Sequence, residues 1–130
     1  MIELLLLMIS FAPPPKSVND GVYTVDQASR GKELYAKQCA SCHGAMLTGG
    51  ESAPPLVGGE FISNWNGLTA WDLFVRVRKT MPQNKPGSLA LADNADVIAY
   101  MFKMNEFPTG AVELGTKTES LSQITIEPKK

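Results

Sequence analysis

The sequence has little cysteine and little histidine: its 130 residues include two cysteines and one histidine. Two cysteines are too few for a disulfide framework or for a zinc site with four thiolate ligands. No run of about 20 apolar residues is present, so no integral membrane span is expected. Neither sign of charge predominates, with 12 Lys+Arg against 13 Asp+Glu, and this balance argues against a nucleic-acid-binding protein.

The length and composition fit one folded domain with flanking segments. The chain is 44% hydrophobic and 19% charged, which is typical of a globular protein with a modest core. Residues 1–12 contain a short apolar run that is expected to be a signal peptide or its remnant. We expect residues 13–23 to form a proline-rich linker, residues 24–108 the folded domain, and residues 109–130 a polar tail that lies over it.

Both cysteines and the histidine lie in one five-residue segment, Cys39-Ala40-Ser41-Cys42-His43. This is the C-x-x-C-H signature of covalent c-type haem attachment. Two thiols one helical turn apart can add to the two vinyl groups of haem, and His43 then supplies the proximal ligand of the iron. The second ring nitrogen of His43 needs its own partner, usually a backbone carbonyl.

Three other kinds of site could use these residues. A thioredoxin-like site would open a helix after a strand in a βαβ pattern, whereas here the cysteines end a helical segment. A zinc knuckle would need a fourth ligand, and the chain has no other cysteine or histidine. A disulfide between Cys39 and Cys42 is also possible, but it leaves His43 without a role.

This segment and its surroundings resemble the class I cytochrome c family, over roughly residues 21–108. Residues 22–24, 27–31 and 81–89 look like bacterial mono-haem cytochromes. In particular they resemble the cytochrome domains and subunits that serve quinoprotein alcohol dehydrogenases. The resemblance implies an all-α cytochrome c fold in which three main helices surround one covalently attached haem c.

Capping signals and apolar periodicity predict the three helices. Thr24 and Gln27 have the spacing of a capping box, with Gln27 reaching back, and they predict a helix over about residues 25–38. A second capping signal at residues 69–72 predicts a helix over 70–79, and an apolar stripe predicts a third over 91–105. Residues 44–59 are rich in glycine and predict a loop. The resemblance implies that Gly31 permits a close crossing of the first and last helices.

The resemblance also implies further residues of the haem site. Pro54 would accept a hydrogen bond from the ligating imidazole through its carbonyl oxygen, and Leu56 would pack on the haem; Pro55 could shift this register by one. Phe61 is expected to pack on the haem edge. Trp65 is the better candidate for an indole that donates to a haem propionate, and its alternative is an ordinary core aromatic.

Methionine is the usual sixth ligand in this family, and Met81 is the best of six candidates. Met81 follows a predicted helix and lies in a loop with Pro82 and Gly87, which can cross the haem face opposite His43. The other five precede the domain, lie too close to His43, or fit the apolar stripe of the third helix: Met1, Met8, Met46, Met101 and Met104.

Ligation by His43 and Met81 raises the reduction potential and leaves no open position on the iron. We therefore expect a single-electron carrier that uses the Fe(II)/Fe(III) couple and transforms no substrate by itself. Its expected partners are a dehydrogenase donor and an oxidase or other cytochrome acceptor of the respiratory chain, and it could be the cytochrome subunit of the dehydrogenase. Because haem c is attached outside the cytoplasm, we expect a bacterial periplasmic protein. The alternative is a ligand sensor or peroxidase-like protein with an open sixth site.

One stretch of the chain carries positive charge without acidic residues. It holds Arg76, Arg78, Lys79 and Lys85, around the expected methionine loop. Such a stretch could present a basic rim to an acidic redox partner, because complementary charge speeds encounter. It could equally neutralise haem propionates or form a solvated helix face.

Overall fold

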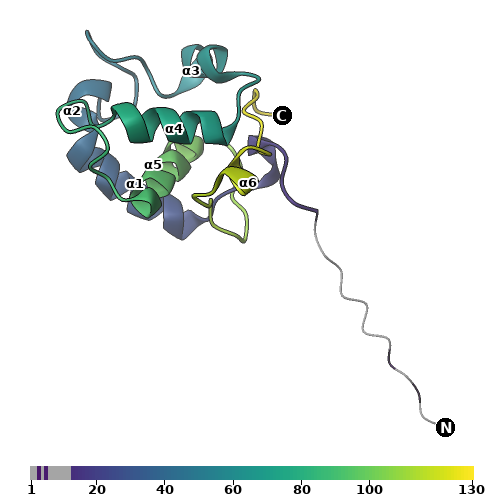
Figure 1. Cartoon of the computed structure of the whole chain (residues 1–130). Helices are drawn as coiled ribbons and strands as arrows, with labels where there is room; N and C mark the ends of the chain where they lie inside the picture. Colours follow the sequence, from purple (N-terminus) through teal and green to yellow (C-terminus); the bar gives the residue numbers. More distant parts are fainter. Residues whose placement is uncertain (1–2, 4, 6–12) are drawn as a thin grey trace.

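The computed structural model describes residues 3, 5 and 13–130, so the predicted signal segment lies almost entirely outside the described residues. Within residues 13–130 the chain forms helices and no strand, which confirms the all-α fold class. Figure 1 shows their arrangement. The elements are η1 Val18–Asp20, α1 Val25–Gln38, α2 Ala40–His43, α3 Gly58–Trp65, α4 Ala70–Thr80, α5 Leu91–Met104 and α6 Thr118–Leu121.

The three predicted helices are α1, α4 and α5. The bounds of α1 agree with the prediction, α4 continues one residue further to Thr80, and α5 ends one residue earlier at Met104. Side-chain caps fix two of the starts. The hydroxyl of Thr24 accepts from the backbone N–H of Gln27 at 3.1 Å, and Thr69 forms a full capping box with Asp72 at the start of α4.

Helices α1 and α5 pack against each other (Figure 1), and Gly31 lies where they meet. A Cβ atom at this position would overlap the backbone oxygen of Asp96 and would lie 3.0 Å from Cβ of Tyr100. The absence of a side chain at Gly31 therefore allows the two helix backbones to approach closely. The resemblance to the cytochrome c family implied this close crossing.

Segments outside the predicted 24–108 domain contribute to the same core. Val18 and Val22 are buried before α1, and Leu121, Ile124 and Ile126 are buried after α5. The boundaries at residues 23 and 108 stay predictions, but the apolar side chains on both sides of them pack together.

The C-terminal tail runs between two other segments in extended form at residues 124–126. Thr125 forms a parallel bridge with Ser17 and an antiparallel bridge with Thr69. The N–H of Ile126 donates to the carbonyl of Leu68 at 2.8 Å. The tail therefore holds the segment before α1 against the turn that joins α3 to α4.

Two local predictions are wrong. The loop predicted over 44–59 ends earlier, because α3 begins at Gly58; a helix of 8 residues carries too little periodicity to be recognised beside two glycines. The side chain of Gln27 does not reach back to Thr24. It is buried and bonds the backbone of Leu114 instead, a partner that lies 87 residues away in the chain.

Candidate functional site

The end of α1 and the single turn of α2 carry the C-x-x-C-H segment. Cys39 caps α1, and its carbonyl accepts from the N–H groups of Cys42 at 3.2 Å and His43 at 3.0 Å. One turn of backbone therefore presents both thiols and the imidazole together. Cys39 is half-buried, Cys42 is exposed, and both thiols are free.

The ring of His43 is buried and held by one contact. Its Nδ1 lies 2.8 Å from the carbonyl oxygen of Pro54. A carbonyl can only accept a hydrogen bond, so Nδ1 carries the proton and Nε2 keeps its lone pair for a metal. The acceptor is Pro54 and not Pro55.

The glycine-rich loop folds back onto the histidine through close backbone contacts. The N–H of Gly49 donates to the carbonyl of His43 at 2.8 Å. Gly49 has a φ of +87°, and a Cβ there would lie 2.8 Å from the backbone nitrogen of Pro55. Glycine is needed here for both its left-handed conformation and its small size. The loop is then closed by a hydrogen bond from the N–H of Leu56 to the carbonyl of Leu47 at 2.8 Å.

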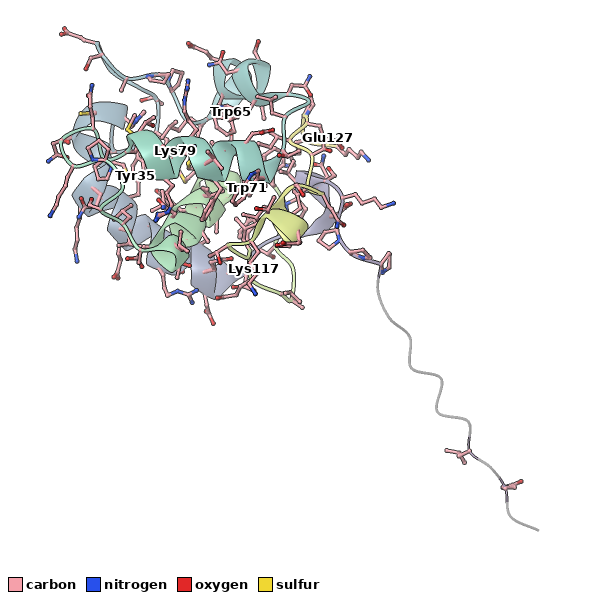
Figure 2. All side chains as sticks on the ribbon, in the orientation of Figure 1. Tyr35, Trp65, Trp71, Lys79, Lys117 and Glu127 are labelled. Atoms are coloured by element: carbon pink, nitrogen blue, oxygen red, sulfur yellow. The ribbon has the colours of Figure 1, made fainter. Side chains whose placement is uncertain are left out.

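Several of the expected cofactor-contacting side chains belong to one apolar cluster. Phe61 of α3 is fully buried, and Cys39, Leu56 and Trp65 are partly buried against the same core. Figure 2 marks Trp65 at the end of α3. These four residues therefore belong to or border the hydrophobic core of the described residues, and their contacts with haem stay predictions.

Met81 follows α4 directly, as its C-cap residue. It is half-buried, and its N–H donates to the carbonyl of Val77 at 2.9 Å. Its own carbonyl accepts from the N–H of Gly87 at 3.4 Å. The backbone of Met81 is therefore held from both sides, and its role as a ligand stays a prediction.

The hydrogen bonds by which Asn105 and Tyr35 support the site were not predicted. The side-chain amide of Asn105 donates to the carbonyls of Leu56 at 2.9 Å and Met101 at 2.8 Å, which ties the loop to the end of α5. The hydroxyl of Tyr35 donates to the carbonyl of Gly44 at 2.6 Å, directly after His43. Their partners are set by tertiary packing, so no local sequence signal could have identified either contact.

The chemistry of the donors separates haem from the other kinds of site. Burial, and next the neighbouring Cys42, raise the pKa of the Cys39 thiol to about 11, whereas redox-active thiols have lowered pKa values. Among the described residues, no three His, Cys, Asp or Glu side chains are grouped as metal ligands. Two free thiols beside an oriented imidazole fit covalent attachment of haem.

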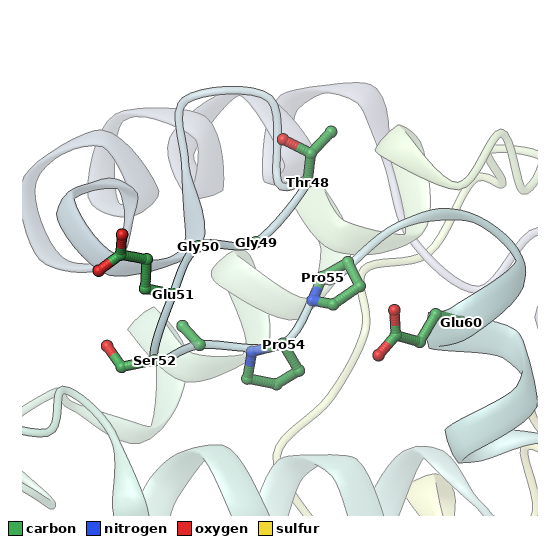
Figure 3. A pocket seen from close by; sticks show the side chains of 9 residues that line it. Thr48, Gly49, Gly50, Glu51, Ser52, Pro54, Pro55 and Glu60 are labelled. Carbon is green, nitrogen blue, oxygen red and sulfur yellow. The ribbon is translucent and has the colours of Figure 1, made fainter.

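A hollow of about 480 Å³ lies on the glycine-rich loop (Figure 3). Residues 48–55 and Glu60 of α3 line it. Its walls include the carboxylates of Glu51 and Glu60 and offer little of the apolar surface that a porphyrin ring requires. The hollow borders the attachment site through Pro54, but its polar walls do not suit a porphyrin ring.

Comparison with known families supports the same chemistry. The model of the family described as "Cytochrome C oxidase, cbb3-type, subunit III" matches residues 26–101, more than half of the chain. The chain belongs to this cytochrome c family. Cytochrome c domains bind haem covalently, and the cofactor of this chain is haem c.

Two relatives extend this picture. A thiosulfate dehydrogenase from Stutzerimonas stutzeri (strain A1501) is 39% identical over 80 residues, which cover 56% of this chain and 26% of the relative. The matched part is thus about a quarter of that protein's length. The crystal structure of the sulfane dehydrogenase SoxCD from Paracoccus pantotrophus matches with a TM-score of 0.53 at 19% identity, covering 92% of this chain and 68% of that one. This second likeness shows the cytochrome c fold.

Within the described residues, no helix is long and apolar enough to cross a membrane.

Proposed function

We propose that this cytochrome c domain is a single-electron carrier with one haem c, ligated by His43 and Met81. When bound, haem supplies the Fe(II)/Fe(III) couple. Cys39 and Cys42 attach it, and Leu56, Phe61 and Trp65 enclose it. The observation that carries the proposal is the 2.8 Å contact between Nδ1 of His43 and the carbonyl of Pro54, because it orients Nε2 as a ligand.

The backbone around Met81 supports its role as the second axial ligand. Val77 and Gly87 hold the residue at both its N–H and its carbonyl, so its thioether extends from a fixed point at the end of α4. A thioether favours ferrous iron relative to harder donors, which raises the reduction potential. If His43 and Met81 both held the haem iron, no position on it would be open to a substrate, and the chain would transfer electrons without transforming a substrate by itself.

The proposed partners are redox proteins of the bacterial periplasm. Electrons would come from a dehydrogenase and pass through an oxidase or another cytochrome to the respiratory chain. The likeness of residues in this chain to part of a thiosulfate dehydrogenase supports a dehydrogenase donor.

Carbon monoxide binding to the reduced full-chain protein tests the proposal. We expect no binding at neutral pH in the wild type, because Met81 fills the sixth position. Met81→Ala should bind carbon monoxide and should have a lower reduction potential.

Met46→Ala is the matched control, since Met46 is exposed beside the motif and should leave both readouts at wild-type values. Binding of carbon monoxide by the wild type would contradict the carrier proposal. It would favour instead a ligand sensor or a peroxidase-like protein with an open sixth site.

A further inference from the structure

A groove lies between α4, the start of α5 and the C-terminal tail. Its volume is about 610 Å³. Trp71, Phe74 and Val75 of α4 form one wall, and Leu91 of α5 lies opposite. Figure 2 marks Trp71 and Lys79 on α4. None of the residues that line the groove belongs to α1 or α2. The groove is therefore separate from the attachment segment that these two helices carry.

Apolar side chains form the body of this groove. The rings of Trp71 and Phe74 stack with centroids 5.6 Å apart and planes inclined by 14°. Leu91, which also lines the groove, is 45% exposed. An apolar side chain of a partner would remove this surface from water, which is favourable in proportion to the area covered.

Positive charge gathers at the rim. Arg78 and Lys79 line the groove, and Arg76 and Lys85 lie in the same stretch of chain, which holds no acid. The whole chain has 12 cationic and 13 acidic side chains, so the remainder, with 8 against 13, has a net charge of −5. This stretch is therefore positive in a chain that is otherwise net negative, and its two cations at the groove attract and orient an acidic partner.

The groove also adjoins the segment of the proposed axial ligand. Lys79 precedes Met81 by two positions in the sequence, and Gly87, which lines the groove, donates its N–H to the carbonyl of Met81 at 3.4 Å. A partner seated in the groove would therefore contact the loop that carries Met81, and electrons would have a short path to it.

We propose that this groove is the docking site for an acidic protein partner in electron transfer. The partner places an apolar side chain against Trp71 and Leu91, and its carboxylates pair with Arg78 and Lys79. This inference rests on the proposed function and adds the surface and the chemistry of the partner to it.

The test uses a synthetic peptide of glutamates flanking two leucines as the probe. The peptide is titrated into the isotope-labelled, reduced full-chain protein, and amide chemical shifts are followed by NMR. We expect the shifts to gather at Val75, Arg78, Gly87 and Thr116, residues of the groove, and binding to weaken as salt is added. A peptide with serines in place of the leucines should bind more weakly.

Two double variants separate a local site from a general effect of charge. Arg78→Gln with Lys79→Gln should weaken binding by about tenfold, because it removes the cations at the rim. Lys32→Gln with Lys37→Gln removes the same charge from exposed positions of α1 and should leave the affinity near the wild-type value. Lys37 and Lys79 each lie in the last turn of their helix, where a cation stabilises the helix. Both double variants therefore remove such a cation, and the loss of helix stability is matched.

Equal weakening by both double variants, or shifts centred outside the groove, would overturn the docking site. Stronger binding to vesicles of anionic lipid than to the peptide would overturn the protein partner in favour of a membrane surface. Carbon monoxide binding does not depend on Arg78 or Lys79. A failure of docking can therefore be told apart from a failure of the proposed axial ligation.

Discussion

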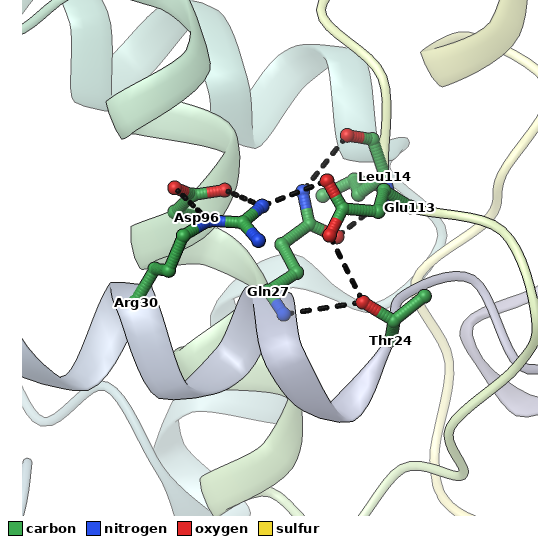
Figure 4. A network of polar contacts seen from close by, with 6 residues as sticks. All are labelled: Thr24, Gln27, Arg30, Asp96, Glu113 and Leu114. Atoms are coloured by element: carbon green, nitrogen blue, oxygen red, sulfur yellow. Dashed lines mark hydrogen bonds and ion pairs between the residues drawn. The ribbon is translucent and has the colours of Figure 1, made fainter.

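The side-chain amide of Gln27 makes two hydrogen bonds with the backbone of Leu114 (Figure 4). Its Nε2 donates to the carbonyl at 2.9 Å, and its Oε1 accepts from the N–H at 2.7 Å. Both residues are buried. The first turn of α1 thus satisfies both backbone groups of a tail residue, and it fixes the start of the tail over the helices.

Replacement of Gln27 by leucine should destabilise the protein. Gln27→Leu leaves the N–H and the carbonyl of Leu114 buried without partners, which costs about 1–3 kcal/mol. Urea unfolding measures this loss, and faster hydrogen exchange at the amide of Leu114 reports it locally. Gln38→Leu, at an exposed position of the same helix, is the control. Unchanged exchange at Leu114 would show that this pair does not hold the tail.

The helix crossing at Gly31 should tolerate no side chain. A Cβ at this position would overlap the backbone of Asp96, so Gly31→Ala pushes α1 and α5 apart and should cost about 1–3 kcal/mol in the free energy of unfolding. Gly59→Ala is the control: it lies in α3 with open space around it and should stabilise the protein by about 0.5–1 kcal/mol. A Gly31→Ala protein as stable as the wild type would contradict the crossing geometry.

The ion pairs of Arg30 should make stability depend on pH in the acid range. Arg30 bonds Asp96 and Glu113, and the bond from Arg30 holds the pKa of Glu113 below its usual value of 4.5. A lowered pKa in the folded state stabilises the protein above the unfolded pKa, and this contribution is lost as pH falls through the folded value.

Glu113→Gln should therefore flatten the decline of stability below about pH 4.5. The effect at neutral pH should be small and should shrink with added salt, because both side chains are half-exposed and screened. Thermal unfolding at a series of pH values measures it, with Glu119→Gln on α6, another exposed carboxylate, as the control. Parallel profiles for Glu113→Gln and the wild type would show that this pair contributes nothing.

The tail should behave as part of the core. Ile126 is fully buried, and Ile126→Ala leaves a cavity that should cost about 2–5 kcal/mol. Val112→Ala, at a position that is 77% exposed, should change little. Calorimetric melting of the two variants makes the comparison, and equal melting temperatures would mean that the tail packs only loosely.

Local signals were enough to predict the three long helices. Thr24 and Thr69 are hydroxyl N-caps, and each is followed by an amphipathic sequence. A few neighbouring residues are therefore enough to predict where α1 and α4 begin. The C-x-x-C-H segment is equally local, and it predicted the chemistry of the cofactor.

Contacts between distant segments were not predictable in the same way. The partner of Gln27 lies in the tail, and Asn105 bonds the loop of Leu56 across a separation of 49 residues. The local pattern around Gln27 also favoured a capping box, and tertiary packing prevailed over it. For the same reason, the contribution of Ile124 and Ile126 to the core was evident only once the tail was seen to pack against the helices.

The visible absorption spectrum of the purified full-chain protein tests the central claim most directly. We predict a six-coordinate haem c spectrum whose oxidised form has the weak long-wavelength band of an iron–methionine bond. The band should vanish in Met81→Ala and persist in Met46→Ala. A haem c spectrum that lacks the band in the wild type would contradict ligation by Met81, and a protein without covalent haem would contradict the whole account.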